Sequence, residues 1–339
     1  DCLLSRGLGD VYKRQLLCTR YSILKAIIFC LSIFTLFAVI KTLMQKFIGF
    51  DSFETKWLNA GGATTHIIWS GIRYFSFFTD ASNMGANMGA AIMFFGIASL
   101  YMRSALCKIY YSCIAILALY ALFLSGTRGA MIVPLAGLAL YTLISKQTKM
   151  VIGGASMLLF IYIFFAFTTI GQSNSSIRRI RTAFNPTKDA SYIVRKENQK
   201  KLATYLKYKP FGEGLGLSGD GLGVKISTRF TTSIPTDSWY VKIWVETGIV
   251  GLILYLSMIF FTIGWGGWII ATQIKDLELK GLLSGLLCGI FGMFINAYAN
   301  SFWGQFPTMI IAFMGLTFVL NGPYFDKEIR IKKLTVSNK

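Results

Sequence analysis

The sequence is short of acidic residues and almost without histidine. Its 339 residues include 15 Asp and Glu against 34 Lys and Arg, and His66 is the only imidazole. Charged residues make up 14% of the chain, whereas soluble domains carry about 25%. This deficit excludes an ordinary water-soluble globule. With one histidine, a histidine-based metal cluster or a Ser-His-Asp triad is also hard to build.

The cysteines are not arranged to carry chemistry. The 6 cysteines include no CxxC pair and no Cys/His ligand spacing, and none lies in the long polar segment 171–238. Structural zinc sites and disulfide frameworks need clustered cysteines. Neither a metal site nor a disulfide framework is predicted.

Apolar residues, in contrast, make up 54% of the chain and fall into blocks that are nearly free of charge. Blocks of about 16 to 23 residues are long enough to cross the hydrocarbon core of a bilayer as helices. The sequence therefore predicts an all-α polytopic membrane protein. Eight blocks are expected to be transmembrane helices: 23–43, 84–101, 109–124, 129–144, 150–170, 249–271, 281–299 and 302–320.

The basic residues set the expected orientation. Lys and Arg lie in the connections after the second, fourth and sixth blocks and in the tail 321–339, and such short basic segments stay in the cytoplasm. This assigns 16–170 to five transmembrane helices, 171–238 to one large outer loop and 239–320 to three further helices. The tail 321–339 is then cytoplasmic.

The segment 1–15 departs from this pattern. It resembles the translation of an adaptor sequence and lacks the basic, apolar and small-residue order of a signal peptide. We exclude it from the fold and expect the natural protein to begin further upstream, with additional transmembrane helices.

The outer loop is strongly basic, with 12 Lys and Arg against 5 Asp and Glu in 171–238. Nucleic acid is not expected outside a membrane, so the available anions are lipid phosphates or pyrophosphates and acidic glycans. The alternative is a basic surface that rests on lipid headgroups.

Arg128 is the only charged residue between 109 and 144, and it stands in the short hairpin 124–130. An arginine at the edge of the hydrocarbon either snorkels to the headgroups or grips a phosphate with its guanidinium fork. Gly126 and Gly129 on either side let the backbone approach a bound group. We therefore favour a role in binding.

Segment 191–208 predicts an amphipathic helix in the outer loop. Arg195 shares a face with Leu202 and Leu206 by three- and four-residue spacing. Arg195 is therefore a second candidate for binding phosphate. The alternative is an ordinary basic residue at a membrane interface.

A glycine-rich loop follows this helix. Residues 214–219 match GxGxxG by letter, but no strand is predicted before them and no helix after them, so a dinucleotide site is rejected. The backbone N–H groups of Gly212, Gly214 and Gly216 can bind a pyrophosphate, or the loop is a plain flexible connection.

Two acidic residues accompany the next helix. Asp237 is a natural helix N-cap and also an acid at the mouth of the membrane region. Glu246 lies nine residues later, on the opposite helix face and about 13 Å along the axis. The two cannot form a glycosidase-like pair, and Glu246 is expected to pair with Lys242.

Three motifs resemble, in the same order, those of the O-antigen ligase and polymerase superfamily of bacterial envelope glycosyltransferases. Residues 125–130 (SGTRGA) are similar to its arginine hairpin, and Arg195 with 210–216 (PFGEGLG) to its R…PxGxG stretch. Residues 236–252, with Tyr240 and Glu246, look like its third motif. Upstream, Arg73 and Asn83 resemble an element at the start of a span. The resemblance covers about 73–320.

The resemblance implies a GT-C-like glycosyltransferase in the bacterial inner membrane, with its active site facing the periplasm. The enzyme would transfer or polymerise an oligosaccharide linked to undecaprenyl pyrophosphate, without metal or other cofactor, during surface polysaccharide biosynthesis. The implied catalytic residues are Arg128, Arg195 and Asp237. The implied substrate-binding residues are Arg73, Asn83, Gly212, Gly214, Gly216, Tyr240 and Glu246.

The partners implied are the lipid-linked donor, a glycan or lipid A-core acceptor, membrane lipids and other polysaccharide-assembly proteins, but no nucleic acid. The ligase branch carries a histidine where this chain has Asp237, which slightly favours a polymerase over a ligase that acts on lipid A-core. A transporter or flippase for lipid-linked glycan is the alternative from another class. The repeated halves common in transporters are not visible in the sequence.

Overall fold

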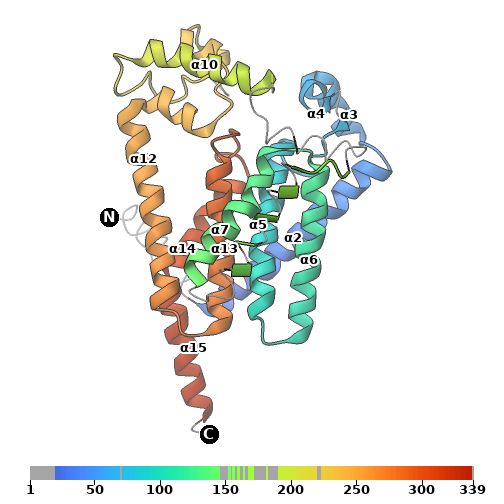
Figure 1. Cartoon of the computed structure of the whole chain (residues 1–339), viewed down its shortest axis with the longest axis vertical. Helices are drawn as coiled ribbons and strands as arrows, with labels where there is room; N and C mark the ends of the chain where they lie inside the picture. The colour runs from blue at the N-terminus through green and yellow to red at the C-terminus, as the bar shows by residue number, and fades with distance from the viewer. Residues whose placement is uncertain are drawn as a thin grey trace, which may run out of the picture.

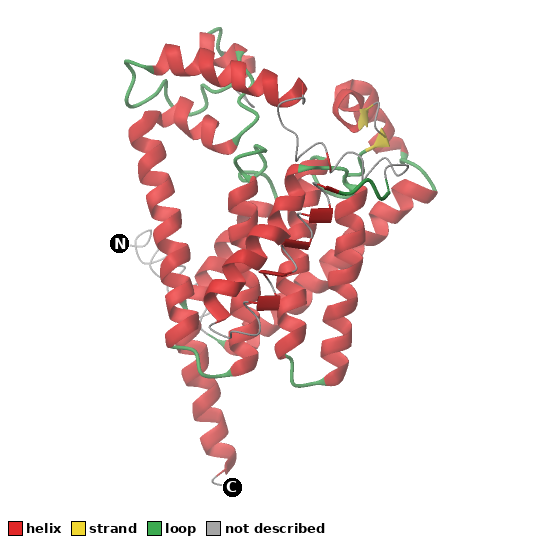
Figure 2. Ribbon diagram, in the orientation of Figure 1, coloured by secondary structure: helices red, strands yellow, loops and turns green. Residues whose placement is uncertain are grey.

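The computed structural model describes residues 20–68, 71–145, 190–219 and 223–337, together with some residues between 152 and 181. The segment 1–15, set aside above, lies outside the described residues. Within them the regular secondary structure is helical except for one antiparallel pair of two-residue strands, β1 (Ile67–Ile68) and β2 (Gly71–Ile72). Figure 2 shows the helices standing side by side as a bundle.

Among the described residues, five helices are long and apolar enough to span a membrane. They are α2 (Tyr21–Phe47), α5 (Ala81–Tyr101), α6 (Ala105–Leu124), α12 (Trp239–Thr272) and α13 (Leu277–Asn296). A sixth span results if α14 (Thr308–Leu320) and α15 (Gly322–Ser337), which meet at a bend of 56°, are taken as one. The all-α, multi-pass prediction is confirmed.

The predicted count of eight spans is not confirmed. The block 129–144 forms a short 3-10 turn, η2 (Gly129–Met131), and then α7 (Ile132–Ser145), a shorter apolar helix. The block 150–170 is described only in part, at 152–153, 155–156, 159–160, 163–164 and 167–170. The block 302–320 is helical only from Thr308, because Phe302 and Trp303 are buried in a loop instead of facing lipid.

The centre of the bundle is the contact between α5 and α13. A Cβ added at Gly285 would lie 2.7 Å from the Phe94 carbonyl oxygen, and one at Gly289 would lie 2.9 Å from that of Ala90. Close backbone packing of this kind stabilises helix pairs in lipid, where burying apolar side chains gains little. Gly292 approaches the Val133 carbonyl on α7 in the same way.

The two ends of the bundle carry different structures. Figure 1 shows α3 (Ser52–Trp57), α4 (Ala63–His66) and α10 (Ala190–Leu206) at one end and α15 at the other. We call these the α10 end and the α15 end. The helix α10 corresponds to the predicted amphipathic helix, and its Leu202 and Leu206 are buried against Val241 and Val245 of α12.

Ion pairs hold the α15 end together. Asp276, the N-cap of α13, is buried and pairs with Arg103 from the α5–α6 connection and with Lys333 of α15. Glu278 pairs with Lys25 of α2 at 2.8 Å. Three helices, α2, α13 and α15, and the α5–α6 connection are therefore tied to one another at this end, far from the segments that carry the predicted site.

Candidate functional site

Arg73 anchors the site to α5. It follows β2, and its guanidinium donates to the Thr65 carbonyl at 3.1 Å, to Ser82 Oγ at 3.3 Å and to Thr127 Oγ1 at 2.8 Å. Ser82 is in the first turn of α5, and Thr127 directly precedes Arg128. Arg73 therefore joins the start of α5 to the arginine hairpin.

The hairpin is held against the bundle on both sides of Arg128. Thr127 is buried and donates from its hydroxyl to the Ala81 carbonyl at 3.1 Å. On the other side, a Cβ at Gly129 would lie 2.6 Å from Asn300 Nδ2 and 2.9 Å from Asn296 Oδ1. Only glycine at position 129 lets the hairpin come this close to the turn that follows α13.

Arg195 reaches the same turn from α10. Its Nη1 donates to the Ala299 carbonyl at 2.8 Å, and Ala299 lies between the two asparagines that Gly129 contacts. The Nε of Arg195 lies 3.8 Å from Asp237 Oδ2. Two arginine-bearing segments, 67 positions apart in the sequence, thus meet at residues 296–300.

The positive charges of Arg128 and Arg195 both act on Arg73. Burial lowers the pKa of Arg73, and the charges of Arg128 and Arg195 lower it further, against the opposing effect of Asp80. Because the charges of Arg128 and Arg195 repel that of Arg73, positive charge is concentrated at the α10 end. An anion with several oxygens would relieve that repulsion.

Asp237 does not cap a helix, so that prediction was wrong. The N-cap of α12 is Ser238, whose side chain makes no capping bond, and Asp237 itself has φ 52°. This left-handed backbone conformation is one that aspartate tolerates better than most residues. It turns the carboxylate away from the helix start and toward Arg195.

The glycine-rich loop is fastened to a break in α12. Gly248 interrupts the helix with φ 71°, and a Cβ there would lie 1.9 Å from the Pro210 carbonyl oxygen. The N–H groups of Glu213 and Gly214 donate to the carbonyls of Val245 and Glu246 at 2.9 and 3.0 Å.

Gly212 is also used for packing. Its N–H donates to the Lys209 carbonyl, and a Cβ there would lie 2.5 Å from the Gly248 nitrogen. These N–H groups therefore bind the protein's own carbonyls. Gly216, with φ 79°, has open space where a Cβ would be.

The remaining predicted site residues are Glu246, Tyr240 and Asn83. Glu246 accepts from the buried Ser218 hydroxyl at 2.7 Å, whereas Lys242 lies over the Trp239 ring, so the predicted pair of Glu246 and Lys242 was wrong. Tyr240 donates to the Phe294 carbonyl near the end of α13. Asn83 is fully buried, and its amide donates to Thr79 and to the Phe306 carbonyl at 3.0 and 3.1 Å.

The sequence analysis did not single out His66 or Asn296 as parts of the site. His66 is buried; its Nε2 accepts from the Ala81 N–H at 3.2 Å, and its carbonyl accepts from the Arg73 N–H at 2.8 Å. Asn296 ends α13 and touches the hairpin. Neither residue belongs to a motif, so only contacts between distant segments reveal them.

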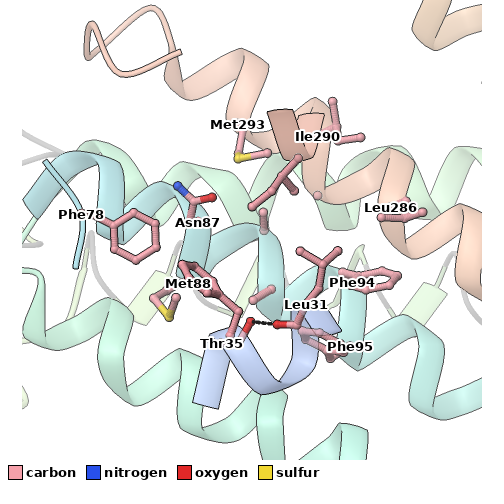
Figure 3. Close-up of a pocket in the computed structure, with 15 residues that line it drawn as sticks. Leu31, Thr35, Phe78, Asn87, Met88, Phe94, Phe95, Leu286, Ile290 and Met293 are labelled. Atoms are coloured by element: carbon pink, nitrogen blue, oxygen red, sulfur yellow. Dashed lines mark hydrogen bonds between the residues drawn. The ribbon is translucent and has the colours of Figure 1, made fainter. Parts of the chain in front are cut away.

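A cavity within the bundle is chemically different. It lies between α2, α5, α13 and α14, and its lining is mainly apolar, including Leu31, Phe78, Phe94 and Met293 (Figure 3). A diphosphate would lose its hydration there without compensation. The charged part of a ligand is therefore expected to bind near Arg73, Arg128 and Arg195.

In the described part of the chain, no group of three or more His, Cys, Asp or Glu could hold a metal ion.

Comparison with known proteins adds one result. Residues 113–256 match the family model described as O-Antigen ligase. This range contains Arg128, Arg195 and Asp237, whereas Arg73 and Asn83 lie before it. No curated protein and no solved structure matches the chain significantly. The resemblance stated from the motifs is confirmed.

Proposed function

Because this multi-pass membrane protein carries an O-antigen ligase domain, we propose that it is a glycosyltransferase of bacterial surface polysaccharide biosynthesis. Its donor is an oligosaccharide linked to undecaprenyl pyrophosphate. The reaction transfers this oligosaccharide to a hydroxyl of a growing glycan. The α10 end faces the periplasm, 171–238 is a periplasmic loop, and the membrane is the inner membrane.

One observation carries the proposal. Arg195 binds the Ala299 carbonyl while Gly129, next to Arg128, packs on Asn296 and Asn300. The segments that carry the two arginines therefore border the same turn, and Arg73 contributes a third charge close by. A diphosphate carries charge on several oxygens and is bound well by such a group of guanidinium forks.

The reaction needs charge stabilisation more than any other assistance. As the anomeric C–O bond breaks, the carrier pyrophosphate leaves with the bonding electrons and its negative charge increases. Arg128 and Arg195 stabilise that charge, and fixed donors are most effective when they are held in place before the reaction. The bonds of Arg73 to Thr65, Ser82 and Thr127 hold the hairpin in this way.

Asp237 acts as the general base for the acceptor hydroxyl. Its carboxylate accepts the proton of the incoming hydroxyl while the oxygen attacks the anomeric carbon. An aspartate that stands where the ligase branch has histidine supports a polymerase over a ligase acting on lipid A-core. Gly212 and Gly214 act by fastening the loop to α12, Tyr240 by fastening α12 to α13, and Asn83 by fastening α5 to the segment before α14.

The test uses purified protein in proteoliposomes with lipid-linked oligosaccharide. Wild type should lengthen the glycan and release carrier pyrophosphate, whereas a flippase would do neither. Arg128→Ala and Arg195→Ala should each reduce turnover at least 100-fold, the usual effect of removing a charge-stabilising donor. Undiminished turnover in properly folded variants would remove the arginines from the mechanism.

A further inference from the structure

Asn296 is a fully buried amide with half of its bonding capacity unused. Its Oδ1 accepts from Asn300 Nδ2 at 3.1 Å. Its Nδ2 is also buried, and no hydrogen-bond partner lies within reach among the described residues. A buried donor without a partner has lost its hydrogen bonds to water and gained none in return. Such a group therefore calls for a ligand or an ordered water.

The position of this amide favours a ligand. Asn296 touches Gly129, the neighbour of Arg128, and lies three residues before Ala299, which binds Arg195. It is therefore placed between the two arginine-bearing segments. A second buried polar group lies nearby. The hydroxyl of Ser238, one residue after Asp237, has no hydrogen-bond partner in the described part of the chain. The Trp239 N–H beside it donates to the Ala297 carbonyl, so Ser238 lies against the same turn.

We infer that Asn296 is a substrate-binding residue whose Nδ2 donates a hydrogen bond to a diphosphate oxygen of the lipid-linked donor. The inference rests on the proposed function for the identity of that donor. A neutral amide among arginines suits an anion, because it adds a donor without adding to the repulsion between the cations. Asn300 fixes the amide by donating to its oxygen, which leaves the nitrogen free to donate to the ligand.

Asn296→Asp tests this role while keeping the size and the acceptor oxygen of the side chain. The new carboxylate cannot donate, and it competes with the diphosphate for the arginines. We expect KM for the lipid-linked donor to rise about tenfold or more, the usual effect of losing a hydrogen bond to a charged group. The melting temperature should hold or rise, because the carboxylate pairs with nearby cations. Lowering the pH should restore KM as the carboxyl regains a proton that it can donate.

Two further variants complete the set. Asn296→Ala should raise KM to a similar extent without the recovery at low pH. Asn59→Asp adds a negative charge to an exposed residue at the same end of the molecule and should leave KM within twofold of wild type. A lower melting temperature with unchanged KM in both Asn296 variants would show a purely structural amide and overturn the inference.

A binding measurement separates this inference from the proposed function. Farnesyl pyrophosphate should raise the melting temperature of wild type and not that of Asn296→Asp. If that shift is equal in the two proteins, the inference fails even where Arg128→Ala and Arg195→Ala have lost turnover. If the shift differs but wild type neither transfers nor lengthens glycan, the proposed function fails and Asn296 remains a diphosphate ligand.

Discussion

The carboxylate of Asp237 lies 3.8 Å from the Arg195 guanidinium, across the gap between α10 and the start of α12. Their side chains are 42% and 37% exposed, and an ion pair this open contributes about 0–1 kcal/mol to stability. Stability alone therefore does not account for the left-handed backbone that directs Asp237 toward the arginine. The geometry instead leaves an accessible acid beside the cation that we assign to the leaving group.

Asp237→Asn removes the base and preserves the shape of the side chain. We expect turnover to fall about 100-fold or more, the range lost with a general base, while KM for the donor stays within threefold. Initial rates against donor concentration measure both values. Glu197→Gln, on the exposed surface of α10, is the matched control and should keep full activity. A fully active Asp237→Asn protein would leave Asp237 with no role beyond contact with Arg195.

Gly248→Ala tests the fastening of the glycine-rich loop. The new methyl group would meet the Pro210 carbonyl at 1.9 Å, and alanine would have to adopt φ 71°. We expect a loss of roughly 2–4 kcal/mol from the combined clash and backbone strain. Thermal unfolding in detergent checks it. Gly264→Ala is the control on the same helix, because a Cβ there meets nothing within 4 Å; it should be neutral or stabilising. Equal stability of the two variants would contradict the packing described here.

The sequence predicts the membrane-spanning helices better than it predicts how the candidate site is built. The apolar blocks of α2, α5, α6, α12 and α13 were found because charge-free runs are a local property of the sequence. The block 302–320 was overestimated, since Phe302 and Trp303 are equally apolar whether they face lipid or are buried in a loop.

Within the site, Arg128 and Arg195 were chosen by residue type and spacing. Their meeting place at 296–300 could not be predicted, because it depends on contacts between α10, the hairpin and the end of α13. For the same reason the sequence favours Asp237 as a helix cap, and it leaves open whether the N–H of Gly212 binds a pyrophosphate or belongs to a plain connection. The backbone groups of Gly212 and Gly248 face each other across two segments that no local pattern connects.

The buried His66 should make the stability of the protein depend on pH. Burial lowers its pKa, the Gly62 carbonyl and Asp80 oppose that shift, and the charge of Arg73 adds to it. The folded protein therefore binds fewer protons than the unfolded chain. The stability is present above the unfolded pKa, about 6.5, and is lost as the pH falls from that value through the lower pKa of the folded protein.

We expect the melting temperature of wild type to fall between pH 7 and pH 5. The change should be smaller in His66→Gln, which can still accept the Ala81 N–H. Protonation of the ring removes that acceptor at the start of α5 and places a charge near Arg73. Parallel melting curves for wild type and His66→Gln across this range would show that another group is responsible.

Asp276 and Asn296 lie at opposite ends of α13, so substitutions there separate stability from binding. Burial alone would raise the pKa of Asp276, but bonds from Lys333 and the Leu279 N–H, with the charge of Arg103, lower it overall. The contribution of Asp276 to stability is therefore present above the unfolded pKa of about 3.9 and is lost as the pH falls below that value.

Asp276→Asn should lower stability by about 2 kcal/mol, since it leaves cations unpaired and weakens a helix cap. KM for the donor should not change, because α13 is rigidly packed on α5 between its two ends. Melting temperature and KM measured on the same preparation test both points, and a rise in KM would show that loosening the α15 end is transmitted along α13 to the arginines.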